Sequence, residues 1–342
     1  MTDTVRRCAV LGSPIAHSLS PRLHRAAYAW LGLNWQYERH QLTVAELPAF
    51  RAGLDDRWRG LSCTMPLKSA IVDWGQPDDI VRSLGVANTV IFDGSPQDPA
   101  TTRIRNTDVT GLMAIFRSAG SAPGTGGGVE ERAGYYAETA DGDLTDVQVR
   151  QHTDPAGSDP IDVQVHHDTD TTANALSVSN DDPVLRTDQP EQPPIRSALV
   201  VGTGATATSA LYAMARSGCT QAQVVGRNAQ AIDHLTAAAE SWGLTVTGRS
   251  FDDVWVPADV VISTVPAAVA GDLATRLVAA APVIFDVLYD PWPTPLMAAA
   301  QAANRTVLTG RDLLIAQAQG QILEMTGQFC PAAVLCQALV TD

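Results

Sequence analysis

The chain has 342 residues, 45% of them hydrophobic, and a formal net charge of −14. This length favours two domains, and the hydrophobic fraction is high enough for sizeable cores. The acidity is local, because residues 121–194 hold 15 acids and three arginines, whereas the remainder holds 22 acids and 20 basic residues. Neither part offers the basic surface that nucleic-acid binding requires. No apolar run approaches the roughly 20 residues of a membrane span.

The cysteines and the N-terminus indicate the cellular compartment of the protein. Five cysteines are scattered along the sequence in a pattern that fits neither a disulfide framework nor a zinc site. This usage is typical of a reducing cytoplasm. The first residues lead directly into an expected strand, so we expect no signal peptide. We therefore expect a cytoplasmic protein that binds small molecules, with no nucleic-acid, membrane or metal partner.

The first 118 residues alternate short apolar runs with helical patterns, as in an α/β domain. Ser20 followed by Pro21 predicts a helix start, and Gly32 predicts its end. In chain order, we expect a strand over 7–11, that helix, a strand over 35–41, a helix over 44–54, a strand, turn and helix within 60–70, a strand ending at 92, a strand over 103–105 and a helix to 118.

Lys68 is the only lysine in the chain, since all other basic residues are arginines. Arginine cannot deprotonate near neutral pH, whereas lysine can when its pKa is lowered. With Thr64 as a cap and Pro66 as a first helical residue, Lys68 falls in the first turn, where the helix dipole disfavours a cation. A residue that breaks a local rule is a candidate functional residue. The alternative is a surface lysine at a helix start.

Other polar side chains lie at expected strand and helix ends. Ser18 and Ser20 precede a helix and suit an anionic group such as a substrate carboxylate, although Ser20 could simply be an N-cap. Asn88 lies at a turn, where asparagine is common for backbone reasons, and Asp108 could merely cap the next helix. Gln317 lies on an otherwise apolar helix face, where a buried amide needs a partner.

Residues 119–194 differ in kind from the rest of the chain. They are rich in Asp, Gly, Thr and Ser, poor in large apolar residues and strongly acidic. Such a segment cannot bury enough surface to offset chain entropy, so we expect it to be disordered. It also holds a repeat, because residues 146–154 recur at 162–170 with six of nine positions identical. The alternative is a hairpin built on the two Asp-Val-Gln-Val repeats.

An expected strand over 197–201 leads into Gly202-Thr203-Gly204-Ala205-Thr206-Ala207 and a helix to about residue 217. This is G-x-G-x-x-A between a strand and a helix, the context of a dinucleotide-binding turn. The next strand, over 222–225, ends in Gly226-Arg227-Asn228. It lacks the acid that would bind the ribose hydroxyls of NAD, and Arg227 can meet a 2′-phosphate, so we expect NADP. Strands over 259–264 and 282–285 and the last helices follow.

Seven ordered motifs carry a family resemblance: L-G-S-P-I-A-H-S-L-S-P, C-T-M-P-L-K, A-N-T, N-T-D-V-T-G, the G-x-G-x-x-A turn, Y-D-P-W-P-T-P-L and G-R-D-L-L-I-A-Q. Over 1–118 and 195–335 the chain resembles shikimate dehydrogenases. The resemblance implies a two-domain α/β fold: a substrate domain over 1–118, completed by C-terminal helices within 306–342, and a Rossmann-type NADP domain over 195–305. The acidic segment 119–194 joins them, and the active site is expected in the cleft between them.

The resemblance also implies roles for individual residues. Ser18 and Ser20 would hold the substrate carboxylate, and Lys68 with Asp108 would carry the chemistry. The substrate hydroxyls would be bound by Thr64, Asn88, Asp108 and Gln317, with Tyr289 nearby. The expected cofactor-binding residues are Gly202, Gly204, Ala205, Ala207, Arg227, Thr264, Val265 and Gly310.

The chain departs from the family pattern at two places. Ser62-Cys63 stands where the family commonly has Asn-Val, and Gly226-Arg227-Asn228 stands where it commonly has Asn-Arg-Thr. The second change removes two polar side chains from the phosphate site. The implied activity is the NADP-dependent interconversion of 3-dehydroshikimate and shikimate by a monomer or homodimer. Alternatives are a quinate or aminoshikimate dehydrogenase, and a non-catalytic NADP-binding sensor that signals through the acidic segment.

Overall fold

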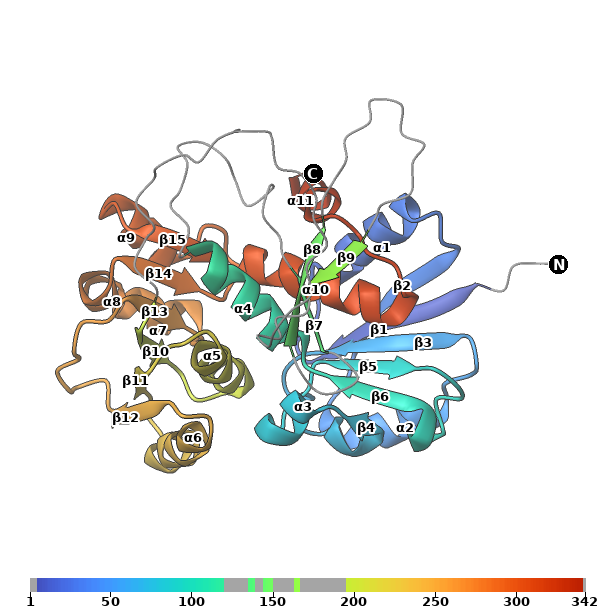
Figure 1. The fold of residues 1–342 in the computed structure, drawn as a ribbon, viewed down its shortest axis with the longest axis horizontal. Helices are drawn as coiled ribbons and strands as arrows, with labels where there is room; N and C mark the ends of the chain where they lie inside the picture. The colour runs from blue at the N-terminus through green and yellow to red at the C-terminus, as the bar shows by residue number, and fades with distance from the viewer. Residues whose placement is uncertain (1–4, 120–134, 139–143, 150–162, 167–194, 341–342) are drawn as a thin grey trace, which may run out of the picture.

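Two six-stranded sheets form the two halves of the molecule (Figure 1). The computed structural model describes residues 5–119, 135–138, 144–149, 163–166 and 195–340. In Figure 1 the N-terminal sheet lies on the right and the second sheet on the left, with helices α4 and α10 between them. The predicted two-domain α/β class is confirmed, and the functional residues have to be sought where the two halves meet.

The N-terminal sheet is mixed, with the order β2-β1-β3-β5-β6-β4. β5 runs antiparallel to both β3 and β6, whereas β1 is parallel to β2 and β3. Its strands are β1 (Arg6–Gly12), β2 (Trp35–Gln41), β3 (Trp58–Cys63), β4 (Gln76–Pro77), β5 (Thr89–Phe92) and β6 (Thr102–Arg105). Its helices are α1 (Ser20–Trp30), α2 (Leu47–Ala52) and α3 (Asp79–Leu84), with short 3-10 turns at η1 (Val44–Glu46), η2 (Val72–Trp74) and η3 (Pro99–Thr101).

The second sheet is entirely parallel, with the order β12-β11-β10-β13-β14-β15. This is the doubly wound order of a dinucleotide-binding domain, whose ligand crosses the ends of the strands where the order reverses. Its strands are β10 (Ser197–Val201), β11 (Gln221–Val225), β12 (Thr245–Arg249), β13 (Val260–Ser263), β14 (Val283–Asp286) and β15 (Thr306–Thr309). Its helices are α5 (Ala205–Arg216), α6 (Ala229–Ser241), α7 (Ala267–Asp272), α8 (Ala274–Ala280) and α9 (Pro295–Ala302).

Two long helices join the halves. α4 (Thr107–Ala119) and α10 (Gly310–Thr326) pack against each other, and α4 also packs against α5 of the second half. Buried apolar side chains of α4 belong to the same core cluster as those of β10, α5 and α6. One example is Phe116, whose ring meets that of Phe285 edge-on at 6.2 Å. α10 returns to the first half, where it contacts α1, β3 and β5, and α11 (Ala332–Val340) covers α1.

Three strands lie within the acidic segment: β7 (Tyr135–Glu138), β8 (Leu144–Val149) and β9 (Val163–His166). They form an antiparallel sheet of their own, and β7 runs beside α4 and α10. The β8–β9 register pairs Val147 with Val165 and Gln148 with Gln164, so the two Asp-Val-Gln-Val repeats lie opposite each other. The pairing of β8 with β9 matches the hairpin that is the alternative to disorder, because the alternating repeats supply a pairing pattern. The rest of 119–194 lies outside the described residues.

Replacing residues 121–194 with a short Gly/Ser linker is expected to leave a folded protein that keeps most of its turnover. Every residue that we assign to the site belongs to other elements, and flexible loops between domains change stability little with length, about 0.6 kcal/mol per doubling. Thermal unfolding and initial rates measure the outcome, and limited proteolysis of the full chain is the companion test. Large loss of turnover in the shortened protein, or a segment that resists proteolysis, would make the strands a functional element.

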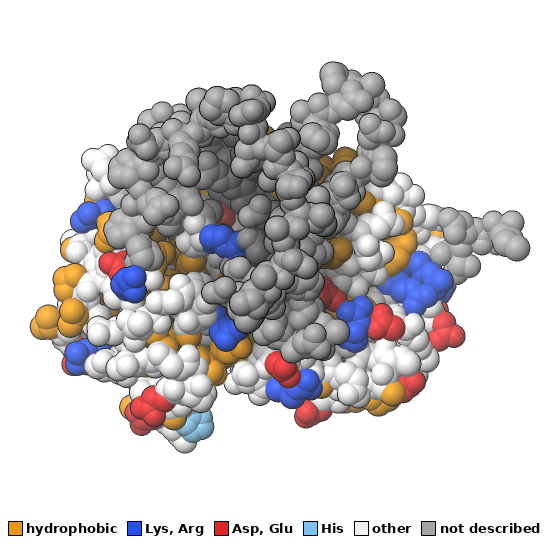
Figure 2. Space-filling view, in the orientation of Figure 1, with side chains coloured by type: hydrophobic (Ala, Val, Ile, Leu, Met, Phe, Trp, Pro, Cys, Tyr) orange, Lys and Arg blue, Asp and Glu red, His pale blue; other side chains and the backbone are white. Residues whose placement is uncertain are grey.

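No helix in the described part of the chain is both long and apolar enough to cross a bilayer. On the face shown in Figure 2, acidic and basic side chains lie interspersed around the part that is not described. That face therefore presents no large field of one sign within the described residues.

Candidate active site

Lys68 and Asp108 form a close ion pair where the halves meet. The Lys68 Nζ lies 2.5 Å from the Asp108 Oδ2, and only 13% of the lysine side chain and 3% of the aspartate side chain are exposed. Lys68 comes from the loop after β3, and Asp108 from the first turn of α4. The interpretation of Lys68 as a surface lysine is wrong, because its ammonium is mostly buried against a carboxylate.

Asn88 holds this pair in place from the end of the loop before β5. Its Nδ2 donates to the Asp108 Oδ1 at 2.9 Å and to the Gln317 Oε1 at 3.3 Å. Its Oδ1 accepts from the Thr107 N at 2.8 Å and from the Thr89 Oγ1 at 2.8 Å. Asn88 is 1% exposed, so its role is more than that of a turn residue. One buried amide thus joins β5, α4 and α10.

Asn106, which sequence reasoning missed, orients Asp108. Its Oδ1 accepts from the Asp108 N at 3.1 Å and from the Val109 N at 3.4 Å, so Asn106 caps α4. Its Nδ2 donates to the Ser209 Oγ of α5 at 3.2 Å. Asp108 is therefore not the cap, and its carboxylate is free to meet Lys68. An asparagine two residues before an acid at a helix start was the available signal.

The expected helix over 66–70 is wrong. The residues after Thr64 form turns instead, in which the Leu67 N donates to the Thr64 O. The carbonyls that a helix would need are used elsewhere, because the Met65 O accepts from the Ser13 N and the Lys68 O accepts from the Ala87 N. These bonds tie the loop to its neighbours and place Lys68 beside the Asn88 turn. The predicted helix over 44–54 is likewise shortened to η1 and α2.

Ser18 and Ser20 lie at the start of α1, on the carboxyl side of β1. Ser20 is the first residue of the helix rather than its cap, and the Ser18 Oγ accepts from the Ser20 N at 3.3 Å. Arg39 fixes this loop, because its guanidinium donates to the carbonyls of Ala16 and Ser18, both at 2.6 Å. The two serines therefore sit on a braced loop. Thr64 faces the same loop, since a Cβ on Gly12 would collide with the Thr64 Cγ2.

Gln317 and Tyr289 reach the site from the second half of the chain. Gln317 lies in α10 and accepts the bond from Asn88 described above, so the partner that its amide required is found. Tyr289 packs among residues of α1 and α10, and burial raises the pKa of its hydroxyl. The loop that carries Tyr289 is anchored by the buried Asp286, which accepts from the Thr294 Oγ1 at 2.6 Å. The Nδ1 of the exposed His17 lies 3.5 Å from the Oδ2 of the exposed Asp290.

A buried hydrogen-bond chain supports the site from behind. The Gln321 Oε1 lies 3.2 Å from the His24 Nε2 and accepts from the Ser62 Oγ at 2.8 Å. Ser62 in turn accepts from the Tyr37 hydroxyl at 2.6 Å. The Gln321 Nε2 donates to the Thr89 Oγ1 at 3.3 Å, and Thr89 bonds to Asn88. Ser62 is thus part of this hydrogen-bond chain, which gives its hydroxyl two partners at a position where the family commonly has asparagine.

His24 makes folding stability depend on pH. Burial lowers the pKa of His24 to about 3, far below the value near 6.5 of an unfolded histidine. As the pH falls, the unfolded chain binds a proton on His24 before the folded chain does. The contribution of neutral His24 to folding stability is therefore complete above pH 6.5 and is lost as the pH falls toward 3. Between pH 7 and pH 5 we expect a loss of about 2 kcal/mol in the free energy of unfolding from this group.

Urea unfolding at both pH values tests this expectation. His24→Gln should show a smaller loss between pH 7 and pH 5 than the unaltered protein, because glutamine does not titrate. His234→Gln, at an exposed position in α6, is the matched control and should keep the full loss. An unchanged pH dependence in His24→Gln would show that the histidine does not cause it.

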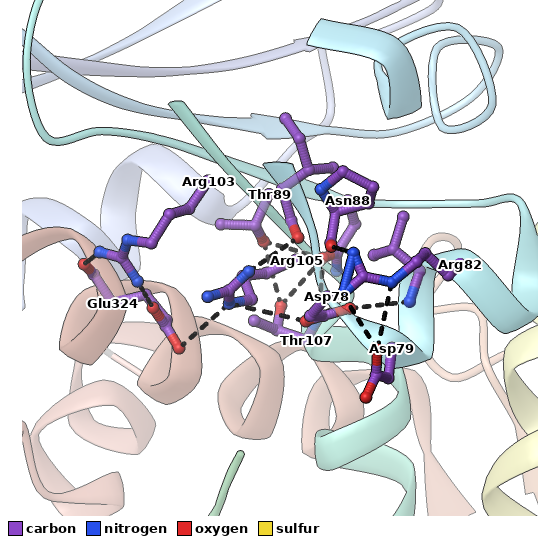
Figure 3. Close-up of polar contacts among 12 residues, drawn as sticks. Asp78, Asp79, Arg82, Asn88, Thr89, Arg103, Arg105, Thr107 and Glu324 are labelled. Atoms are coloured by element: carbon purple, nitrogen blue, oxygen red, sulfur yellow. Dashed lines mark hydrogen bonds and ion pairs between the residues drawn. The ribbon is translucent and has the colours of Figure 1, made fainter. Parts of the chain in front are cut away.

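Arginine and acid pairs fasten α10 to the first sheet (Figure 3). The Glu324 Oε2 lies 2.5 Å from the Arg103 Nη1 of β6, and Arg103 also pairs with Asp93 at 2.6 Å. Arg105 lies 3.6 Å from Asp78 and 4.0 Å from Glu324. Since Gln317 lies two turns earlier on the same helix, this cluster helps to fix its register against Asn88.

The glycine-rich turn in the second half has the shape that a pyrophosphate requires. Gly202 has φ +116°, and a Cβ there would collide with the Thr264 Oγ1. Gly204 is the N-cap residue of α5 and makes no side-chain cap, and a Cβ on Gly204 would meet no heavy atom within 4 Å. No side chain caps the first N–H groups of this helix of 12 residues, and such a helix start favours an anion. These residues fit a dinucleotide.

The other predicted cofactor residues border the same strand ends. Ala205 opens α5, and Ala207 is fully buried beneath it. Thr264 and Val265 directly follow β13, and Gly310 opens α10, where a side chain would collide with the Val287 carbonyl. Arg227 is exposed just after β11 and forms no ion pair with the described residues. It is placed to meet an anion at the end of this strand.

The fold and these two sets of residues define a class. A doubly wound sheet with an uncapped helix N-terminus, packed through α4 against a second α/β half that holds a buried lysine–aspartate pair, defines an NAD(P)-dependent dehydrogenase.

Comparisons with known proteins identify the family. The model of the shikimate dehydrogenase substrate-binding domain matches residues 10–90, and that of the F420-dependent NADP oxidoreductases matches residues 198–288. The chain is 32% identical to the Natronomonas pharaonis shikimate dehydrogenase (NADP(+)), across 39% of this chain and half of that one. It is 25% identical to that of Citrifermentans bemidjiense, across 99% of this chain and 96% of the other.

A solved structure extends the likeness over both chains. The Mycobacterium tuberculosis shikimate dehydrogenase superposes with a TM-score of 0.69 at 30% identity, covering 98% of each chain. The chain therefore belongs to the shikimate dehydrogenase family.

Proposed function

We propose that the protein is an NADP-dependent shikimate dehydrogenase that interconverts 3-dehydroshikimate and shikimate. The observation that carries the proposal is the buried Lys68–Asp108 pair, held by Asn88, at the junction with a nucleotide-binding half. A non-catalytic sensor needs no such pair. Burying two charges is costly unless their geometry is good, so the pair is better explained by chemistry than by stability.

A nicotinamide cofactor, when bound, would supply the hydride chemistry at C3 of the substrate, so the protein has to place the substrate and move one proton. In the direction of reduction, the Lys68 ammonium donates a proton to the oxygen on C3 and becomes an amine, which solvent then reprotonates. Asp108 orients the ammonium and accepts a hydrogen bond from the new hydroxyl.

The remaining site residues position the ring of the substrate. Ser18 and Ser20, on their braced loop at the start of α1, bind the carboxylate. Thr64, Asn88 and Gln317 bind the hydroxyls, and the Tyr289 phenol closes the site beside the carboxylate loop. Asn88 contacts Asp108 as well as the substrate, so substrate placement and the acid–base pair are coupled.

The test of this activity is an initial-rate assay of the purified full chain with shikimate and quinate, each with NADP+ and NAD+. We expect the highest kcat/KM with shikimate and NADP+. A higher value with quinate would assign the chain to the quinate alternative, and no turnover of any alcohol would support the sensor. We expect the enzyme to act in the cytoplasm as a monomer or homodimer. Burial raises the pKa of the free Cys8 and Cys63 thiols to about 12, so neither is a reactive thiolate near neutral pH.

Arg227→Ala is expected to raise the KM for NADP+ by roughly tenfold to a hundredfold, the size of a charge-assisted bond to phosphate. The KM for NAD+, which lacks the 2′-phosphate, should remain almost unchanged. Steady-state kinetics with both cofactors provide the measurement. Equal effects on the two constants would show that Arg227 does not read the phosphate.

A further inference from the structure

We propose that Arg249, at the end of β12, is a second cation for the 2′-phosphate of the cofactor and acts together with Arg227. The inference rests on the proposed NADP preference. Neither the family pattern nor the sequence pointed to this residue, because β12 was not predicted and its last position matches no motif.

The register of the sheet brings the two arginines together. β11 and β12 are parallel, and the Cα of Arg249 pairs with that of Val225. The Gly226 N donates to the Arg249 O at 3.1 Å, so the two chains remain adjacent beyond the last ladder position. Arg227 is the next residue. Both guanidinium groups therefore originate at the carboxyl edge of the sheet, where the adenosine ribose of a dinucleotide binds.

Arg249 is not committed to the core of the domain. Alternation along β12 puts Val246 and Gly248 toward α6, where a Cβ on Gly248 would collide with Ile232. Arg249 thus points away from α6 and is partly exposed. Long basic side chains commonly bury their apolar stem and keep the charged head at the surface, which would leave this guanidinium within reach of a ligand.

The charge of Arg249 has no partner among the described residues. Its Nε is buried without a hydrogen bond, and its guanidinium forms no ion pair with them. The nearby acid Asp253 is occupied, because its Oδ2 accepts from the Ser250 N at 2.6 Å. Two uncompensated guanidinium groups on neighbouring strand ends repel each other, and a phosphate with nearly two negative charges would offset that repulsion.

The composition of the turn after β11, Gly226-Arg227-Asn228, explains why a second cation is needed there. Gly226 has no side chain, and a Cβ there would collide with the Thr203 Cγ2. Asn228 caps α6, since its Oδ1 accepts from the Ala231 N at 3.2 Å, so its side chain is committed to the helix. Arg227 is then the one side chain of this turn that can bind phosphate. Arg249, on the neighbouring strand β12, would supply the second positive charge that this turn lacks.

The test compares nucleotide binding by the full chain and three variants. Calorimetry measures the Kd of adenosine 2′,5′-bisphosphate and of 5′-AMP for the unaltered protein, Arg249→Ala, Arg227→Ala and Arg196→Ala. Arg196→Ala is the charge-matched control, because Arg196 is exposed beside the amino end of β10, at the opposite edge of the sheet. Arg249→Lys tests rescue by a charge without the guanidinium fork.

We expect Arg249→Ala to weaken binding of the bisphosphate by roughly tenfold and to leave 5′-AMP within about twofold. Arg249→Lys should recover part of the loss, and Arg196→Ala should change neither constant. Equal weakening for both nucleotides would make Arg249 a structural residue and overturn the proposal, as would unchanged binding of the bisphosphate. If the unaltered protein itself fails to prefer the bisphosphate, the proposed NADP preference fails together with the role of Arg249. An intact preference with no effect of Arg249→Ala would refute only the latter.

Discussion

Lys68→Ala should lower turnover by about two to four orders of magnitude, the usual contribution of a general acid or base. The ammonium lies 2.5 Å from Asp108 and is mostly buried, so no other group of the described site can take its place as proton donor. The KM for shikimate should change far less, because the carboxylate and the other hydroxyls keep their partners. Steady-state rates with saturating NADP+ measure both constants.

Lys68→Arg separates charge from proton transfer. Arginine keeps the ion pair with Asp108 but cannot release a proton near neutral pH, so its turnover should stay close to that of the alanine variant. Near-normal turnover in Lys68→Ala would contradict the mechanism. Recovery in Lys68→Arg would show that the charge, rather than the proton, is what the reaction needs.

Asp108→Asn is expected to lower turnover by a factor of a hundred or more, because the amide can neither pair with the ammonium nor hold the substrate hydroxyl in the same way. The double variant with Lys68→Ala should lose clearly less than the two single losses combined, since residues that act as a unit are not additive. The turnover of the unaltered protein, the two single variants and the double variant together forms a double-mutant cycle. Asp79→Asn, which removes an exposed acid paired with Arg82, is the control and should have little effect. Additive losses would mean that Lys68 and Asp108 act independently.

Much of the fold follows from patterns in the sequence. The buried runs in β10, β13 and β14 and the glycine-rich turn after β10 predicted a doubly wound domain, because continuous apolar strands alternating with helices bury both faces of a parallel sheet. β12 was missed since its burial alternates at the edge of the sheet, where polar residues are tolerated. The pairing of β8 with β9 was predicted only as the alternative to disorder, because composition outweighed the alternating repeat.

The site was less completely predictable. Single residues that broke a local rule, Lys68 above all, could be found from the sequence, and the resemblance paired Lys68 with Asp108. The residues that hold this pair in place could not be found. The predicted helix after Pro66 does not form, because the carbonyls of Met65 and Lys68 accept hydrogen bonds from Ser13 and Ala87, which lie in other loops. The bonds of Asn106 to α5 and of Gln321 to Ser62 join residues more than 100 positions apart. No local pattern encodes such pairings.

The most direct measurement follows one atom from cofactor to product. The full chain is supplied with 3-dehydroshikimate and NADPH deuterated at C4 of the nicotinamide, with the (4R) and (4S) forms tested separately, and the product is examined by NMR. We predict shikimate that carries deuterium on C3 from one of the two forms and none from the other. A product without deuterium from either form, or no reduction of the ketone at all, would contradict the assignment of this chain as an NADP-dependent shikimate dehydrogenase.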